Sequence, residues 1–314
     1  MKRIFIDGSA GTTGLRIQER LEKRKDLELF VLPDEKRKDP LYRKEAIAQA
    51  DIAFLCLPDE AAKESAMLAK DSNTVLIDTS TAHRTNPDWA YGFPELSAKH
   101  FSAIQNSCRI ASPGCHASGF IALVHPLMQA NLLKNTAPLS CFSLTGYSGG
   151  GKKMIEQYEA SERDALLHAP RQYGLTQMHK HLKEMTAQTG IAVPPVFCPV
   201  VGDFYSGMQV TVPIHREQLN GATLEQIQET LKAAYNGSMV YYEDCSENGF
   251  LNACALSGKD TMAVTAYGND ERMILCAAYD NLGKGASGTA IECMNIKLGL
   301  DPSFGLDLSF GGNK

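Results

Sequence analysis

The residue best suited to covalent chemistry is a cysteine that follows a short apolar segment and a Pro-Gly turn. Cys115 ends the sequence Ser112-Pro113-Gly114-Cys115, and an apolar helical pattern continues to about Met128. It is the only one of the nine cysteines in such a setting. The helix dipole stabilises a thiolate in the first turn by ~0.3–1 kcal/mol, and by up to ~2 kcal/mol when the thiolate is partly buried. Because this lowers a thiol pKa of ~8.5 by only about one unit, a second group, most simply a histidine, must complete the activation.

Two histidines between Thr176 and Glu184 are the candidates for that second group. The adjacent His116 is disfavoured, because consecutive helical residues point about 100° apart. A helix predicted over 176–188 has one buried stripe, and His179 and His181 lie on opposite flanks of it, so only one of them easily faces a given point. The stripe consists of Leu175, Met178, Leu182 and Met185.

A helix cap at Thr176 would place His179 in the first turn, where the dipole keeps an imidazole neutral, as a general base requires. This favours His179 slightly, but periodicity leaves both histidines open, and either one also fits a structural role. The three histidines His83, His125 and His215 are interpreted as structural.

A glycine-rich loop follows the first predicted strand directly and opens the first predicted helix. Its candidate cofactor-binding residues are Gly8, Ser9, Gly11, Thr12, Thr13 and Gly14. Backbone N–H groups at a helix N-terminus can face a pyrophosphate, and a side chain at Gly8 or Gly11 would hold the phosphates off. The loop therefore predicts dinucleotide binding, and the alternative is a tight turn without a ligand.

The segment after the second predicted strand bears on which dinucleotide binds. Lys36, Arg37 and Lys38 stand about where a ribose-reading residue is expected. Their charges suit a 2′-phosphate, whereas a lone carboxylate suits a free 2′-hydroxyl. This favours NADP over NAD, with a solvated charged loop as the alternative.

The elements that must position these residues follow two patterns. Up to about residue 114, apolar runs alternate with helical stretches, which is typical of a parallel sheet with crossover helices. The expected strands are 3–6, 28–32, 52–57 and 75–78, and the expected helices are 13–23, 41–50 and 60–70. Later, longer strands such as 209–214 mix with helices near 152–159, 176–188 and 223–235, which indicates an α+β arrangement.

We therefore expect an α/β protein of two domains. Residues 1–114 and 285–314 form a Rossmann-like NADP-binding domain with a parallel sheet, to which a last helix near 285–298 returns. Residues 115–284 form an α+β domain for catalysis, substrate binding and oligomerisation. An apolar sheet face with Met208, Val210 and Val212 is the candidate subunit interface, so a homo-oligomer, a dimer or tetramer, is expected.

Composition excludes several classes of function. The formal net charge of −5 provides no basic face, so nucleic acid is not expected as a partner. No stretch of about 18 apolar residues predicts a membrane span, and the N-terminal apolar stretch is too short for a signal peptide. The scattered cysteines indicate reduced thiols and a cytoplasmic protein, and neither a CxxC pair nor a zinc-like cluster supports a metal site.

The joint order of four motifs resembles the N-acetyl-gamma-glutamyl-phosphate reductase family of arginine biosynthesis, in its shorter form. The motifs are the N-terminal GxxGxxG loop, Ser112-Pro113-Gly114-Cys115, the Gly-rich segment 146–152 and the His-Lys-His segment 179–184. A terminal segment, 281–288, is similar to the one that meets the nicotinamide in this family and in aspartate-semialdehyde dehydrogenases. The resemblance spans nearly the whole chain.

The resemblance implies NADPH-dependent reduction of a small-molecule acyl phosphate through a thioester on Cys115, with the histidine as acid and base. It also implies that Asn281, Gly283 and Lys284 contact the cofactor and that Ser148 and Gly149 contact the substrate. Arg84 and Arg109 are candidates to bind phosphate or carboxylate bidentately, or else are ordinary surface charges. The chain departs from the longer family members at Ser112, His116 and Lys183.

Three alternatives remain at this point. The same chemistry suits an aspartyl-phosphate or aminoadipyl-phosphate reductase, which only the pocket distinguishes. A non-catalytic NADP-binding sensor would have no need of a thiol at a helix N-terminus. An ordinary aldehyde dehydrogenase would hydrolyse the thioester with water and would not depend on phosphate.

Overall fold

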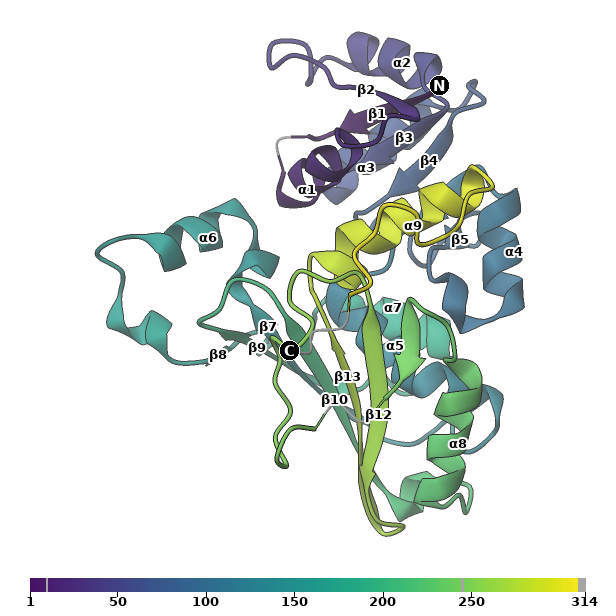
Figure 1. The fold of residues 1–314 in the computed structure, drawn as a ribbon, viewed down its shortest axis with the longest axis vertical. Helices are drawn as coiled ribbons and strands as arrows, with labels where there is room; N and C mark the ends of the chain where they lie inside the picture. The colour runs from purple at the N-terminus through teal and green to yellow at the C-terminus, as the bar shows by residue number, and fades with distance from the viewer. Residues whose placement is uncertain (10, 244–245, 310–314) are drawn as a thin grey trace. The chain divides into compact units, whose positions relative to one another are not determined.

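The computed structural model describes residues 1–9, 11–243 and 246–309 (Figure 1). Its internal contacts group the chain into two compact units. The first unit contains Met1–Pro94, Ala98–Gly114 and Ala286–Leu306. The second contains Glu95–Ser97, Cys115–Gly285 and the described residues from Asp307 onward.

The first unit is built on a six-stranded sheet whose paired strands are all parallel. Its order is β2 (Leu27–Phe30), β1 (Lys2–Asp7), β3 (Ile52–Leu55), β4 (Val75–Asp78), β6 (Arg109–Ala111) and β5 (Ala90–Tyr91). The helices are α1 (Thr12–Leu21), α2 (Pro40–Gln49), α3 (Asp59–Leu68), α4 (Ala98–Asn106) and α9 (Gly288–Lys297). The expected Rossmann-like parallel sheet is confirmed.

Alternation along β1 divides the core of this unit into two layers. Ile4 and Ile6 lie in one buried cluster together with residues of α1 and α9. Phe5 lies in a second cluster with residues of α2. Successive side chains of a strand point to opposite faces, so each face of the sheet receives its own helices. The last helix, α9, belongs to this unit.

The second unit is built on a seven-stranded mixed sheet. Its order is β11 (Val240–Tyr242), β12 (Met262–Gly268), β13 (Arg272–Tyr279), β10 (Met208–His215), β7 (Ser140–Gly146), β9 (Val196–Gly202) and β8 (Arg171–Gln172). The helices are α5 (Cys115–Gln129), α6 (Lys152–Glu159), α7 (His181–Thr189) and α8 (Leu224–Ala234). Helix α5 packs against β10, β13, α7 and α8 and is buried along most of its length. This α+β arrangement is the expected one.

The sheet face that was expected to be a subunit interface is the buried one. Met208, Val210 and Val212 are fully buried in β10. Val210 lies against α5, because a Cβ placed on Gly119 would be 2.7 Å from Val210 Cγ2. The opposite face of the sheet instead exposes Phe142 and Ile274. The predicted interface was therefore wrong: it was placed on the buried face of β10, whereas the residues one position along the strand point to the exposed face.

The predicted helix over 176–188 begins five residues later than expected. Helix α7 starts at His181, and the candidate cap Thr176 lies outside it. Gln177, at φ 55°, is in the left-handed region, which interrupts a helix. Leu175 and Met178, expected in a buried stripe, are 73% and 84% exposed.

Among the residues that the structure describes, no helix combines the length and the apolar character needed to cross a membrane.

Candidate active site

The glycine-rich loop lies where β1 ends and α1 begins, at the carboxyl edge of the parallel sheet. Gly8 has φ +93°, and a Cβ there would lie 2.3 Å from the Cys56 carbonyl oxygen. A Cβ on Gly14 would lie 2.4 Å from the Gly8 carbonyl oxygen. These two glycines are therefore required by the tight strand-to-helix turn itself.

Gly11 is different, because a Cβ there would meet nothing closer than 3.6 Å. It is the N-cap residue of α1, whose first helical residues are Thr12 and Thr13. Since glycine brings no side chain to cap the helix, the N–H groups of the first turn are left for another acceptor. This arrangement fits an anion such as a pyrophosphate.

The charged segment after β2 makes local contacts. The Arg37 guanidinium lies 3.1 Å from an Asp34 carboxylate oxygen, and the Lys36 ammonium lies over the Tyr42 ring at 4.4 Å from its centroid. Asp39 caps α2 through the Leu41 N–H. Both cations lie on a loop that follows β2, next to β1 in the sheet, and neither is buried.

A buried ionic network at the end of β1 was not predicted from the sequence. Arg43 of α2 donates to the Asp7 carboxylate at 3.1 Å, and also to Ser65 and Glu64. Burial raises the pKa of Asp7, and the bonds from Ser65 and Arg43 oppose that rise. Arg43 shares its helix face with the buried Ala46 and Ile47, so a charge in an apolar stripe was the available signal. The network fixes the strand end from which the glycine loop starts.

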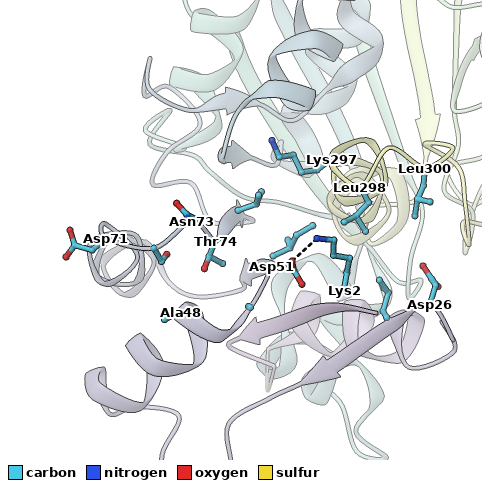
Figure 2. Close-up of a pocket in the computed structure, with 15 residues that line it drawn as sticks. Lys2, Asp26, Ala48, Asp51, Asp71, Asn73, Thr74, Lys297, Leu298 and Leu300 are labelled. Atoms are coloured by element: carbon cyan, nitrogen blue, oxygen red, sulfur yellow. Dashed lines mark hydrogen bonds and ion pairs between the residues drawn. The ribbon is translucent and has the colours of Figure 1, made fainter.

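A groove of about 710 Å³ in the first unit lies at the amino ends of the parallel strands, opposite the glycine-rich loop (Figure 2). Its lining includes Lys2, Leu27, Ile52 and Val75, the first residues of β1, β2, β3 and β4. A dashed line in the figure marks the bond from Lys2 to Asp51. Because ligands of such sheets bind at the carboxyl ends of the strands, this groove is not the candidate cofactor site.

Cys115 is the first residue of α5 and is partly exposed. The helix behind it is buried from His116 to Leu127 and mostly apolar, so the cysteine begins a rigid element. In the first unit, the segment before it is held by Arg84, which donates to the carbonyls of Ser112 at 2.9 Å and Thr79 at 3.0 Å. Arg84 is itself buried, and these contacts give its guanidinium a structural role.

The three histidines 116, 179 and 181 form one cluster in the second unit. The ring centroid of His116 lies 6.0 Å from that of His179 and 5.6 Å from that of His181. The ring centroids of His179 and His181 are 4.7 Å apart. The His181 backbone N–H donates to His179 Nδ1 at 3.3 Å, so a neutral His179 carries its proton on Nε2. Burial, and then the charge of Lys180, lower the pKa of His179. A neutral imidazole is what a general base requires.

His116, which the helical argument sets aside, lies inside this cluster. Its Nδ1 is 2.6 Å from Ser143 Oγ and its Nε2 is 2.7 Å from Tyr173 Oη. Burial, followed by the charge of His179, lowers the pKa of His116 to about 3, so the ring is neutral. Its role here is to hold the Tyr173 hydroxyl.

Tyr173 is a residue that sequence reasoning missed. Burial raises its pKa, and negative charge on Cys115 raises it further, so the phenol and the thiol interact electrostatically. The loop between Tyr173 and α7 is tied to β9 by Gln177, which donates to the Phe197 carbonyl and accepts from its N–H, both at 2.8 Å. The His179 ring then packs 5.0 Å from the Phe197 ring. No periodic pattern in the sequence predicts such a loop.

The Gly-rich segment and the segment after β13 meet within the second unit. Asn281 is buried; its Nδ2 donates to Ser148 Oγ at 3.0 Å, and its Oδ1 accepts from the Gly207 N–H at 2.9 Å. A Cβ on Gly149 would lie 3.5 Å from Asn281 Nδ2. The residues expected at substrate and cofactor thus stabilise each other's loops, and their contacts with ligands remain predictions.

Gly283 and Lys284 likewise have partners inside the second unit. The Gly283 N–H donates to Asp280 Oδ1 at 2.8 Å, and a Cβ there would collide with the Lys259 carbonyl. Lys284 is almost fully buried and forms an ion pair with Glu95. The glycine is therefore required by the turn, and the buried lysine pairs with a partly buried carboxylate.

Arg109 lies at the start of β6, at the amino edge of the first sheet. It donates to the carbonyls of Thr74, Cys108 and Ala69. Burial lowers its pKa. Like Arg84, it binds the backbone of its own unit.

Comparison with known proteins follows the same division of the chain. Residues 3–104 match a model described as "Semialdehyde dehydrogenase, NAD binding domain", and residues 115–281 match "Semialdehyde dehydrogenase, dimerisation domain". N-acetyl-gamma-glutamyl-phosphate reductase of Sinorhizobium medicae is 43% identical over 305 residues, covering 94% of this chain and 98% of that protein. N-acetyl-gamma-glutamyl-phosphate reductase 2 of Pseudomonas putida is 40% identical over 306 residues, covering 94% of this chain and 96% of that protein. The chain belongs to the N-acetyl-gamma-glutamyl-phosphate reductase family.

Membership of the N-acetyl-gamma-glutamyl-phosphate reductase family confirms the resemblance drawn from the motifs. Solved structures show the same fold at lower identity. Aspartate semialdehyde dehydrogenase II of Vibrio cholerae aligns with TM-score 0.70 at 18% identity, covering 95% of this chain and 98% of that one. The enzyme of Candida albicans, solved with NADP, aligns with TM-score 0.64 at 13% identity, covering 96% and 100%. The dimerisation-domain match begins at Cys115, the first residue of α5.

Proposed function

We propose that this chain reduces N-acetyl-gamma-glutamyl phosphate to N-acetyl-L-glutamate 5-semialdehyde and phosphate with NADPH, through a thioester on Cys115, in arginine biosynthesis. The observation that carries the proposal is the setting of Cys115. It is a partly exposed cysteine at the N-terminus of a buried helix. Negative charge on this cysteine raises the pKa of Tyr173, whose hydroxyl is bonded to His116 of the three-histidine cluster. Relatives more than 40% identical over nearly the whole chain are named for this reaction. We place the enzyme in the cytoplasm, where its thiols stay reduced.

The first unit is proposed as the NADP-binding domain. The open position at Gly11 and the N–H groups at Thr12 and Thr13 would hold the pyrophosphate, with Ser9 beside them. Lys36 and Arg37 would meet the 2′-phosphate, which would replace Asp34 as the partner of Arg37. When bound, the nicotinamide supplies the hydride that reduces the thioester carbon.

The chain's own residues perform the rest of the reaction. The Cys115 thiolate attacks the acyl carbon, and phosphate leaves as the thioester forms. N–H groups in the first turn of α5 stabilise the oxyanion that develops on the carbonyl oxygen. The neutral His179, or His181 beside it, takes the thiol proton. When the hemithioacetal oxygen re-forms the C=O bond and the C–S bond breaks, the histidine returns that proton to the departing sulfur as the aldehyde leaves.

The second unit is proposed to provide the substrate site and the contact between subunits. Ser148 and Gly149 lie on the loop that Asn281 fixes, so the loop has a defined conformation for a substrate to meet. The exposed sheet face around Phe142 and Ile274 is proposed as the interface of a homo-oligomer. Large apolar side chains are exposed there, and residues 115–281, which include this sheet face, match a dimerisation-domain model.

A spectrophotometric assay in the reverse direction tests substrate, cofactor and reaction together. N-acetylglutamate semialdehyde with NADP and phosphate should give a rise in absorbance at the NADPH maximum. Aspartate semialdehyde, or NAD in place of NADP, should give a much slower rise. Oxidation that proceeds equally well without phosphate would identify an aldehyde dehydrogenase that forms the free acid, and would contradict the proposal.

Replacing Cys115 by serine provides a direct test of the nucleophile. We expect Cys115→Ser to abolish turnover and to leave the Kd for NADPH nearly unchanged, because the phosphates bind to the loop after β1. Fluorescence titration of NADPH measures the affinity. The control is Cys108→Ser, which removes an exposed thiol and should leave turnover intact. Turnover retained in Cys115→Ser would remove the thioester from the mechanism.

A further inference from the structure

A buried tyrosine is bonded to the backbone of the nucleophile. Tyr279 is the last residue of β13, and its hydroxyl donates to the Cys115 carbonyl at 2.5 Å. The same hydroxyl accepts from the Gly119 N–H at 3.1 Å. Residues 115 and 119 are four apart, the spacing at which a helix pairs a carbonyl with an N–H. The Tyr279 hydroxyl therefore bridges the acceptor and the donor of the turn that starts at the nucleophile.

Gly119 leaves the room that this bridge needs. A Cβ on Gly119 would lie 2.7 Å from Tyr279 Oη and 2.7 Å from Val210 Cγ2. Any side chain would therefore displace the hydroxyl or move β10 away from α5. Glycine inside a helix is unfavourable relative to alanine. Its presence in the second turn of α5 is explained by the close approach of the tyrosine.

The turn after β13 encloses Cys115 from a second side. A Cβ on Gly285 would lie 3.2 Å from Cys115 Cβ and 3.4 Å from Tyr279 Cε2. Asp280 fixes this turn, because its carboxylate accepts from the Leu282 N–H at 2.6 Å and from Ser206 Oγ at 2.7 Å. The position of the Cys115 side chain is thus defined by a rigid turn as well as by its own helix.

We propose that Tyr279 is a positioning residue for the nucleophile: its hydroxyl fixes the Cys115 peptide, and with it the direction of the thiol. The inference rests on the proposed function, since it concerns the same cysteine. Burial, and then negative charge on Cys115, raise the pKa of Tyr279 well above its ordinary range. The hydroxyl therefore keeps its proton and remains a donor to the Cys115 carbonyl when the thiol ionises.

Tyr279→Phe tests this role, because it keeps the ring and removes only the hydroxyl. The readout is the rate at which iodoacetamide modifies Cys115 between pH 6 and 9, followed by peptide mass spectrometry without substrate or cofactor. A misplacement of about 1 Å at a reacting atom costs up to ~10²-fold in rate. We expect the limiting alkylation rate and kcat to fall by about tenfold or more, because both depend on the direction of the sulfur. The Kd for NADPH should stay unchanged.

Tyr235→Phe is the matched control. Tyr235 is also buried, and its hydroxyl donates to the Ala122 carbonyl of the same helix at 2.8 Å. The control loses the same group two turns further along α5, so it should alkylate and turn over like the wild type. Gly119→Ala, whose Cβ displaces the Tyr279 hydroxyl, should slow alkylation as Tyr279→Phe does, and it decides the matter if Tyr279→Phe fails to fold.

The proposal is overturned if folded Tyr279→Phe alkylates at the rate of Tyr235→Phe, or if the two tyrosine variants slow equally. These outcomes are separate from a failure of the proposed function. If Cys115→Ser retains turnover, the thioester mechanism fails whatever Tyr279 does. If the wild type oxidises no N-acetylglutamate semialdehyde while Tyr279→Phe still alkylates slowly, the positioning role stands and the substrate assignment fails.

Discussion

At the scale of single residues, His116 shows how burial fixes a protonation state. Both ring nitrogens face hydroxyl groups, Ser143 on one side and Tyr173 on the other. Charging the ring would require one hydroxyl to change from donor to acceptor and would place a cation in a site closed to water. The ring therefore stays neutral throughout the pH range in which the enzyme is expected to work.

This neutrality predicts a pH dependence of stability. The folded pKa is about 3, whereas an unfolded histidine has a pKa near ~6.5, so between these values the unfolded chain binds the extra proton. The free energy of unfolding therefore falls with falling pH, by up to about 1.4 kcal/mol per pH unit for this one group. Urea unfolding at pH 7 and pH 5 should show a smaller decrease in His116→Gln than in the wild type, by roughly 2 kcal/mol.

The exposed His215 supplies the control for that comparison. His215→Gln removes an imidazole at the end of β10, where the side chain is in solvent, and should keep the wild-type decrease between pH 7 and pH 5. If His116→Gln and the wild type lose the same free energy over this range, the folded ring takes up its proton like an ordinary histidine.

At the scale of elements, the sequence predicts best where local chemistry alone decides the conformation. The helix over 152–159 and the strand over 75–78 have the expected bounds, because glycines directly precede the helix and an apolar run from 75 to 77 makes up most of the strand. Helix α7 was misplaced because tertiary bonds compete with its pattern. Gln177 pairs with the backbone of Phe197 in β9, and no local signal reports a partner twenty residues away.

The histidine cluster could be predicted only in part for the same reason. The spacing in the sequence predicts His179 and His181 as candidates to activate Cys115. The loop geometry that places them beside His116 and Tyr173 depends on contacts with β7 and β9. The glycine loop, by contrast, was located from its place between a strand and a helix, although which of its glycines has room for a ligand required coordinates.

That distinction among the glycines gives a prediction for the β1–α1 loop. Gly11→Ala adds a methyl group into open space at an ordinary φ of −80°, so the thermal midpoint should stay close to that of the wild type. The same methyl group would hold a pyrophosphate away from the first turn of α1. We expect the Kd for NADPH, measured by fluorescence titration, to rise at least about tenfold, or ~1.4 kcal/mol.

Gly237→Ala is the control for the added methyl group, because its Cβ also meets only an ordinary contact, at 3.8 Å, in the second unit. It should change neither stability nor NADPH affinity. Gly14→Ala should instead lower stability, since its Cβ would collide with the Gly8 carbonyl. NADPH affinity retained in Gly11→Ala would show that the phosphates bind elsewhere.

At the scale of the whole molecule, strand alternation defines two faces of the second sheet but does not say which one is covered. Helix α5 settles this in favour of Met208, Val210 and Val212 as core. On the other face, Phe142 of β7 pairs with Cys198 and Thr211 in the neighbouring strands, and Ile274 pairs with Pro213. Phe142 and Ile274 are the exposed large apolar side chains among these, and exposed apolar surface on a folded chain marks a face that associates.

Phe142→Lys tests whether two copies meet on this face. In a two-fold symmetric interface each residue occurs twice, so one substitution introduces two ammonium groups that must lose water without gaining partners. We expect sedimentation velocity to show a dimer or larger species for the wild type and a monomer for Phe142→Lys. Met67→Lys makes the same chemical change at a methionine of α3 that is 77% exposed, in the first unit, and should sediment like the wild type. A wild-type monomer, or a Phe142→Lys protein that stays associated, would show that the exposed face around Phe142 is not the subunit interface. The Cys115 cluster lies within one chain in either case. Turnover measured on the same samples would therefore show whether association contributes to activity.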